Sequence, residues 1–233
     1  MTGNLPLLLV PGVLCDASLW THQLNHLSDV ADLEIVETTR DNSIAAIVDR
    51  ALETAPPRFA LAGLSMGGYV ALEFWRRAPE RITRLALLDT SARADSDAAK
   101  ARRKDFIEQA ERGRFKGVTP RLMPTFVHPD RAAEPALVKS ISMMAEAVGR
   151  EAFIRQQHAV MARVDGRPDL PGIDVPTIVI CGREDAATPL FLSEEIAKGV
   201  PGARLCVIEE CGHMSPMERP HAVTALMRDW LLR

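Results

Sequence analysis

The segment Gly63–Gly67 reads Gly-Leu-Ser-Met-Gly and lies between an apolar run, Phe59–Ala62, and an amphipathic stretch, Val70–Trp75. A serine with glycines two residues before and two after it, between a strand and a helix, is typical of a nucleophile elbow. The turn is so tight that bulky residues at positions 63 and 67 would collide with the backbone. The pattern predicts that Ser65 is a candidate nucleophile, exposed at the carboxyl end of a strand.

A serine hydroxyl needs a general base, and the chain has six histidines. His213 follows the apolar run Leu205–Ile208 across a short loop, so we expect it at the same edge of the sheet as Ser65. His22 and His26 lie four residues apart, but no carboxylate-rich motif accompanies them, and we interpret them as surface histidines. We give solvated or core roles to the remaining three, His128, His158 and His221. His213 is therefore the predicted base.

The base in turn needs a carboxylate that orients it and stabilises its charged form. The motif Gly182–Asp185 (Gly-Arg-Glu-Asp) follows the apolar run Thr177–Ile180, again at the carboxyl edge. Asp185 is our choice, while its neighbour Glu184 and Asp89, which ends the run Leu85–Leu88, remain alternatives. The resulting chain order of Ser, Asp and His is typical of one particular fold.

A developing oxyanion needs backbone N–H donors, and the loss of one such donor costs about 10²–10³ in turnover. Pro11-Gly12-Val13 follows the first apolar run, and we expect Gly12 to permit a turn that aims the Val13 N–H at the site. The Met66 N–H is the predicted second donor. Cys15 could be read as a nucleophile, but an unpaired cysteine is more commonly a small apolar filler.

The elements that must position these residues alternate between continuous apolar runs and amphipathic segments, which is typical of parallel strands covered by helices on both faces. Ser43, Asp16 and Thr188 are predicted to mark helix starts. Residues 91–172 break the alternation: they contain helical spacing but no convincing strand. We predict an α/β core in residues 1–90 and 173–233, with an all-helical cap inserted in residues 91–172. The predicted strands are Leu7–Val10, Leu33–Val36, Phe59–Ala62, Leu85–Leu88, Thr177–Ile180 and Leu205–Ile208.

Composition limits the function classes. The chain has 233 residues, 28 Lys and Arg against 31 Asp and Glu, and a formal net charge of −3. This balance argues against a nucleic-acid or acidic-membrane partner. The apolar run Leu5–Val13 is too short to span a membrane and lacks the flanks of a signal peptide. Four cysteines without a C-x-x-C pair indicate reduced thiols, so we expect a cytoplasmic protein.

Four segments together resemble the α/β-hydrolase superfamily, especially its lidded esterase, haloperoxidase-like and carbon–carbon hydrolase branches. They are Leu8–Gly12 with Trp20, Gly63–Gly68, Gly182–Asp185 and Gly212-His213. The resemblance implies a serine hydrolase that needs no metal or organic cofactor. In it Ser65 would be the nucleophile, His213 the base and Asp185 the acid, with the Val13 and Met66 amides as oxyanion donors.

The chain departs from the superfamily pattern in two places. Pro11-Gly12 stands where the superfamily often has His-Gly, so the oxyanion loop is expected to bend differently. Only six residues precede Leu7. We therefore expect the usual antiparallel strand pair to be missing and the sheet to be trimmed to about six, mostly parallel strands.

The predicted reaction is hydrolysis of a small hydrophobic carboxylic ester or lactone through an acyl-enzyme on Ser65. The same residues would serve a carbon–carbon bond or enol-lactone hydrolase, or an acyltransferase. A ligand-binding receptor could also keep this fold, although the intact Ser65, Asp185 and His213 set argues against it. The sequence leaves the oligomeric state open. Apolar residues of the helical segment could line a substrate pocket, namely Met123, Phe126, Val127, Met143, Met144 and Met161.

Overall fold

The computed structural model describes residues 4–233, in which six strands form one sheet of order β2-β1-β3-β4-β5-β6. Every neighbouring pair of strands is parallel, as expected from the apolar runs. The expected strands are all present, and each is longer than the predicted four residues. Their bounds are β1 Leu5–Val10, β2 Ala31–Ile35, β3 Phe59–Leu64, β4 Ile82–Leu88, β5 Thr177–Gly182 and β6 Arg204–Ile208.

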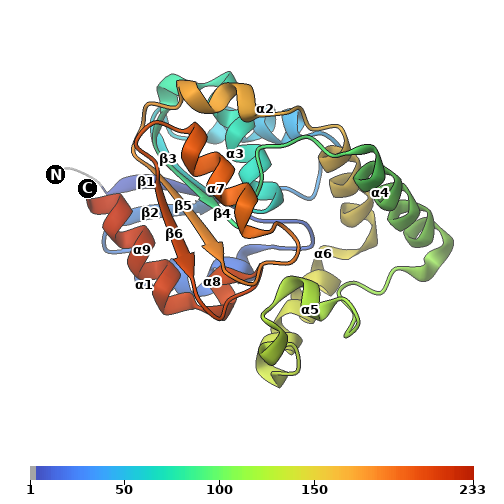
Figure 1. Cartoon of the computed structure of the whole chain (residues 1–233). Helices are drawn as coiled ribbons and strands as arrows, with labels where there is room; N and C mark the ends of the chain where they lie inside the picture. The colour runs from blue at the N-terminus through green and yellow to red at the C-terminus, as the bar shows by residue number, and fades with distance from the viewer. Residues whose placement is uncertain (1–3) are drawn as a thin grey trace.

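Helices cover both faces of the sheet, because side chains on a strand alternate between its two sides. On β1, Leu7 and Leu9 pack into one buried cluster, whereas Leu8 and Val10 pack into the other. Figure 1 shows α1, α8 and α9 on one face and α2, α3 and α7 on the other. These helices are α1 Thr21–His26, α2 Ile44–Thr54, α3 Met66–Arg77, α7 Leu190–Gly199, α8 Ser215–Glu218 and α9 Pro220–Leu232.

Two of the three predicted helix starts are confirmed. The Ser43 side chain accepts a hydrogen bond from the Ala46 N–H (3.1 Å) at the start of α2. Asp16 accepts one from the Ser18 N–H (2.8 Å) and caps a 3₁₀ helix, Ala17–Trp20. The helix predicted to start at Thr188-Pro189 is present, but α7 begins at Leu190, and the Thr188 side chain is hydrogen-bonded to Asp185 instead of capping the helix.

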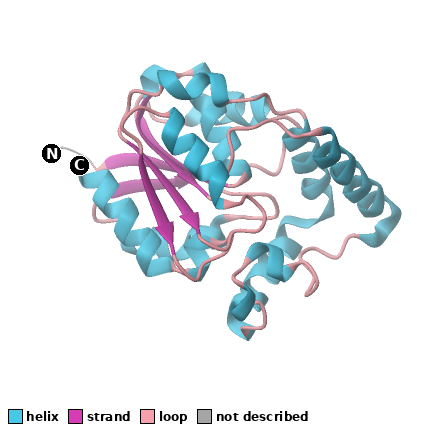
Figure 2. Cartoon of the chain, in the orientation of Figure 1, coloured by secondary structure: helices cyan, strands magenta, loops and turns pink. Residues whose placement is uncertain are grey.

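The chain between β4 and β5 forms helices and no strand within the described residues. They are α4 Asp97–Gln109, a π-helical turn Ala110–Arg114, α5 Met123–Phe126 and α6 Pro135–Met161, with short 3₁₀ helices at Pro129–Arg131 and Arg167–Gly172. Figures 1 and 2 show α4, α5 and α6 gathered to one side, beyond the arrowheads of β5 and β6. The backbone of α6 bends at Gly149, where φ is 79° and ψ is 173°. This group of helices therefore lies next to the loops that carry the candidate site residues.

None of the helices in the described part of the chain is both long enough and apolar enough to cross a bilayer.

Candidate active site

Ser65 sits in a strained turn between β3 and α3. Its φ of 56° and ψ of −114° lie outside the usual regions for a residue with a side chain, and such strain persists only where neighbouring contacts enforce it. The Ser65 N–H donates to the Leu88 carbonyl (3.0 Å). The Ser65 carbonyl accepts from the Thr90 hydroxyl (2.7 Å). The end of β4 thus holds the backbone of the turn from both sides.

The two glycines of the motif are required by close backbone contacts. A Cβ atom on Gly63 would lie 2.1 Å from the Gly67 carbonyl oxygen, and one on Gly67 would lie 2.1 Å from the Val10 carbonyl oxygen. Real Cβ atoms essentially never approach backbone oxygens so closely. The collision expected from the sequence is therefore present, and it forces the chain to present Ser65 at the carboxyl edge of the sheet.

Asp185 and His213 are in direct contact. His213 Nδ1 lies 2.9 Å from Asp185 Oδ2, and both residues are buried. The other Asp185 oxygen accepts the N–H groups of Ala187 (2.9 Å) and Thr188 (2.8 Å). The Thr188 hydroxyl donates to Asp185 Oδ2 (2.7 Å) and lies 3.3 Å from His213 Nδ1. These contacts fix the carboxylate and orient the ring, a role of Thr188 that the sequence analysis missed.

The negative charge of Asp185 and the positive charge of a protonated His213 stabilise each other. Burial raises the pKa of Asp185, but the positive charge on His213 and the hydrogen bonds from His213 and Thr188 outweigh it and bring the pKa below its usual range. Burial lowers the pKa of His213, but the charge on Asp185 and the hydrogen bond to it outweigh that effect and raise the pKa. The imidazolium that would form during general base catalysis is therefore stabilised.

Asp89, the first alternative to Asp185, belongs to a different set of contacts. It is wholly buried, with φ at 43°. Its Oδ1 accepts the Gly182 N–H (2.8 Å), and its Oδ2 is hydrogen-bonded to the Ser215 hydroxyl. Burial and the nearby negative charge of Asp185 raise its pKa well above the usual value. The two hydrogen bonds of Asp89 therefore tie the ends of β4 and β5 to α8.

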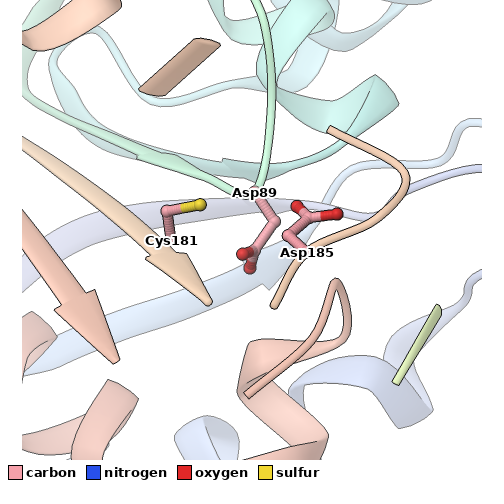
Figure 3. A group of neighbouring side chains, drawn as sticks. All are labelled: Asp89, Cys181 and Asp185. Carbon is pink, nitrogen blue, oxygen red and sulfur yellow. The ribbon is translucent and has the colours of Figure 1, made fainter. Parts of the chain in front are cut away.

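Asp89, Asp185 and Cys181 also lie together, with potential ligand atoms within 4.8 Å of one another (Figure 3). Their chemistry does not fit a metal ion. Both carboxylates already accept hydrogen bonds, and burial together with the charge of Asp89 raises the pKa of the Cys181 thiol. The two carboxylates are therefore accounted for by backbone hydrogen bonds rather than by a metal ion.

Glu184, the other alternative, turns toward the opposite loop. Its Oε2 accepts the Cys211 N–H (3.0 Å). It lies 4.0 Å from His128 Nε2, whereas its neighbour Asp185 faces His213. Glu184 therefore helps to join the loop after β5 to the loop after β6 and makes no hydrogen bond to the candidate base in the described structure.

Glu218 on α8 is a second residue that the sequence analysis missed. It is buried, and its Oε1 accepts the N–H groups of Gly212 (3.0 Å) and Met214 (3.2 Å), the two neighbours of His213. Its Oε2 accepts the His128 N–H (2.7 Å) from the helical segment. One carboxylate therefore fixes both sides of the His213 loop and joins it to residues that follow α5.

The oxyanion loop, residues 11–16, differs from expectation in one respect. The residue with a left-handed backbone is Leu14 (φ 58°), not Gly12. Gly12 serves a close approach, since a Cβ atom there would lie 3.3 Å from Ser65 Cβ and 3.2 Å from the Leu64 side chain. Met66, as the first residue of α3, has an N–H with no partner in the preceding turn. The Val13 N–H donates to no acceptor within the described residues.

Ser65 and His213 are brought to the same edge of the sheet by the ends of β3 and β6, but no hydrogen bond between them forms in residues 4–233. In unliganded enzymes such contacts are often long and tighten only when substrate binds. The ring of Phe126 on α5 lies 6.2 Å from the ring of His213, so the helical segment approaches the candidate base directly.

The remaining candidates have structural explanations. Cys15 is buried, and burial raises the pKa of its thiol to about 12, which suits an apolar filler rather than a nucleophile. All four cysteines are free. His22 lies between His26 and His221, with ring centres 4.2 and 4.5 Å apart. The sequence gives no indication of this contact, because His221 comes from α9.

Of the apolar residues expected near a substrate, Met123, Val127 and Met144 are buried in the core that includes α1 and α9. Met143 is exposed. A cavity of about 320 Å³ borders the oxyanion loop, lined by Pro11, Cys15 and Asp16 on one side and by Ala147 and Val148 of α6 on the other. The space next to the oxyanion loop is therefore bounded in part by the helical segment.

Comparisons with known proteins agree with this architecture. The sequence profile of the Alpha/beta hydrolase family matches residues 7–226. A pimeloyl-[acyl-carrier protein] methyl ester esterase of Neisseria meningitidis serogroup B is 29% identical over 197 residues, which cover 82% of this chain and 76% of that protein.

Two solved structures are similar over almost the whole chain. A thermophilic esterase from Thermogutta terrifontis has a TM-score of 0.88 and 30% identity, covering 99% of this chain and 90% of the other. The enol-lactonase from Burkholderia xenovorans LB400 has a TM-score of 0.88 and 27% identity, covering 99% and 93%.

Proposed function

Because the chain belongs to the alpha/beta hydrolase family, we propose that it is a serine hydrolase that cleaves a small hydrophobic carboxylic ester or lactone. The observation that carries the proposal is the buried hydrogen bond between His213 and Asp185 (2.9 Å), located at the sheet edge where the strained turn presents Ser65. The esterase and enol-lactonase likenesses support this choice of ester and lactone substrates. The near-neutral net charge of −3 is compatible with an uncharged substrate.

In the proposed reaction, His213 Nε2 takes the proton of Ser65 as Oγ attacks the carbonyl carbon. The N–H groups of Val13 and Met66 hydrogen-bond to the oxyanion of the tetrahedral intermediate, and Asp185 stabilises the imidazolium. His213 then gives the proton to the leaving alcohol, and the acyl group remains on Ser65. Water, deprotonated by His213, attacks this acyl-enzyme and regenerates the serine.

We further propose that residues 91–172 act as a cap over a core of residues 1–90 and 173–233. The position of Phe126 near the His213 ring and the Glu218 contact to His128 support this division. A cap in this position would supply apolar surface for the substrate and limit access of bulk water to the acyl-enzyme.

Labelling with a fluorophosphonate probe tests the nucleophile. The wild-type protein should form one adduct, which peptide mass spectrometry should place on Ser65, and Ser65→Ala should not be labelled. Labelling that persists in Ser65→Ala would refute the assignment. A Ser215→Ala variant is a matched control, because Ser215 is buried near the site but bonded to Asp89. It should still be labelled at Ser65.

A substrate panel then separates the reactions that share these residues. Short-chain esters, an enol-lactone and a dienoate with a cleavable carbon–carbon bond should be compared by kcat/KM. We expect turnover of esters or lactones and none of the dienoate. Added alcohols should not divert the acyl group, since diversion would indicate an acyltransferase. A protein that binds these compounds without turnover would instead be a receptor.

A further inference from the structure

Gln156 on α6 makes a long-range contact with the oxyanion loop. Its side chain is completely buried, and its Oε1 accepts the N–H of Leu14 at 3.0 Å, across 142 residues of sequence. Leu14 is the residue of this loop that has a left-handed backbone, with φ at 58°. The contact therefore reaches the one residue of the loop whose conformation is intrinsically unfavourable.

The other end of the Gln156 amide fixes its orientation. Nε2 donates to the Thr38 carbonyl (3.4 Å) in the segment that follows β2. The neighbouring Arg155 Nε donates to the Thr39 carbonyl (2.8 Å). With its nitrogen held toward Thr38, the amide presents its oxygen to Leu14. One helix of the segment between β4 and β5 thus holds two loops at the carboxyl edge of the sheet.

The bonds on either side of Val13 explain why this contact matters. The Cys15 N–H donates to the Gly12 carbonyl (3.2 Å), and the Leu14 N–H donates to Gln156. The turn bond therefore fixes the peptide group that carries the Val13 N–H, and the Gln156 bond fixes the peptide group that follows it. The Val13 N–H itself finds no acceptor in the described residues. Without the Gln156 oxygen, the buried Leu14 N–H would lose its partner and the left-handed residue would lose its restraint.

We propose that Gln156 is a positioning residue for the oxyanion hole: it holds Leu14 in its left-handed conformation and so keeps the Val13 N–H aimed at the developing oxyanion. This inference rests on the proposed ester or lactone hydrolysis. It links the helical segment to the catalytic step as well as to substrate binding. Because an oxyanion donor acts on the transition state, misplacing it should lower kcat more than it raises KM.

The test compares Gln156→Met with Gln157→Met. Both side chains are buried neighbours on α6, but Gln157 accepts a hydrogen bond from Arg103 (2.9 Å) and makes none to the oxyanion loop within residues 4–233. Gln156→Met should lower kcat roughly 10- to 100-fold, which is at most the smallest loss seen when a whole oxyanion donor is removed. KM should stay within about threefold of the wild-type value. The pH at which kcat/KM falls should not move, since His213 and Asp185 are untouched. Gln157→Met should keep kcat within about threefold.

Gln156→Glu is the second variant, because it keeps an oxygen within reach of the Leu14 N–H while losing the donor to Thr38. Its kcat should lie between those of the wild type and Gln156→Met. Equal losses in the two methionine variants, or a loss confined to KM, would overturn the proposal, since either would indicate a general packing role for α6.

Hydrogen exchange measures the same restraint without substrate. The peptide that covers residues 11–20 should exchange faster in Gln156→Met than in the wild type or Gln157→Met. Unchanged exchange of this peptide would refute the positioning role even if activity fell. Because this measurement does not depend on Ser65, failure of the hydrolase assignment and failure of the Gln156 assignment give different results.

Discussion

Replacing Asp185 by asparagine should remove most of the activity, whereas the same change at Asp89 should not. Asp185 accepts backbone N–H groups on Oδ1, and it accepts the Thr188 hydroxyl and His213 Nδ1 on Oδ2. In Asp185→Asn the backbone donors would retain the oxygen, so the new NH₂ group would face His213 Nδ1. Two donors cannot bond to each other. The ring would change tautomer and carry its proton on Nε2, where it could no longer accept one from Ser65.

The expected size of this effect follows from the tautomer change. An asparagine in the place of a triad aspartate costs about 10⁴ in kcat, which corresponds to about 5.5 kcal/mol of transition-state stabilisation. In Asp89→Asn, the amide oxygen can still accept the Gly182 N–H and the NH₂ group can donate to Ser215. Because both of these hydrogen bonds can be kept, and because burial raises the pKa of the Asp89 carboxyl so that a neutral side chain is tolerated there, the kcat of Asp89→Asn should stay within about tenfold of wild type.

The assay is steady-state hydrolysis of the best ester or lactone from the panel, with circular dichroism and thermal melting to show that both variants fold. A large loss in Asp89→Asn together with a small loss in Asp185→Asn would reverse the assignment of the acid. Equal and small losses in both would mean that His213 is not oriented by a carboxylate, and the proposed mechanism would be wrong.

Two further outcomes follow from the site. The charge of Asp185 raises the pKa of His213 above its ordinary value of 6.5, so the neutral base is lost as the pH falls through that raised pKa. In a pH–rate profile, kcat/KM should therefore bend at a pH above 6.5 and fall about tenfold for each pH unit below the bend. A bend at or below pH 6.5 would contradict this. Glu218→Gln keeps only one acceptor oxygen for the N–H groups of Gly212, Met214 and His128. Losing one charge-assisted bond should lower the free energy of unfolding by about 1.5–3 kcal/mol in a denaturant titration, and it should also lower kcat in steady-state kinetics. Unchanged values of both would show that Glu218 does not hold the His213 loop.

The parts of the molecule that sequence predicts are those encoded by local patterns. Each apolar run is a strand because continuous burial on both faces leaves a short, unbroken hydrophobic signature. The turn at Ser65 is predictable because only glycine fits at positions 63 and 67, against the Gly67 and Val10 carbonyl oxygens. The order of the motifs and their positions after predicted strands were enough to predict that Ser65, Asp185 and His213 lie at one edge of the sheet.

The sequence analysis chose Asp185 as the acid, but it could not exclude Glu184 or Asp89. Glu184 and Asp185 are adjacent, and Asp89 also ends a strand, so all three are expected near the same place. Their different partners, a Cys211 amide, the His213 ring and a Gly182 amide, depend on loop conformations to within about an ångström. No pattern of residue types encodes that precision.

The residues that hold the site in place were missed for a related reason. Glu218 bonds to His128 across 90 residues and Gln156 bonds to Leu14 across 142. A lone buried polar side chain has no periodicity, and its partners are backbone groups that every residue possesses. Such residues become visible only when the structure shows which buried N–H groups they satisfy.

The crossover from β4 to β5 can change in length at little cost to the sheet. The strands pair directly, although Leu88 and Thr177 are separated in sequence by the whole helical segment. Chain closure becomes costlier by only about 0.6 kcal/mol for each doubling of the connecting length. Insertions or deletions there are therefore inexpensive for the sheet, while the proposed nucleophile, acid and base remain where the strands end. If the proposed function holds, this segment can change in length without moving the proposed nucleophile, acid and base, provided that a residue in the position of Gln156 still bonds to Leu14.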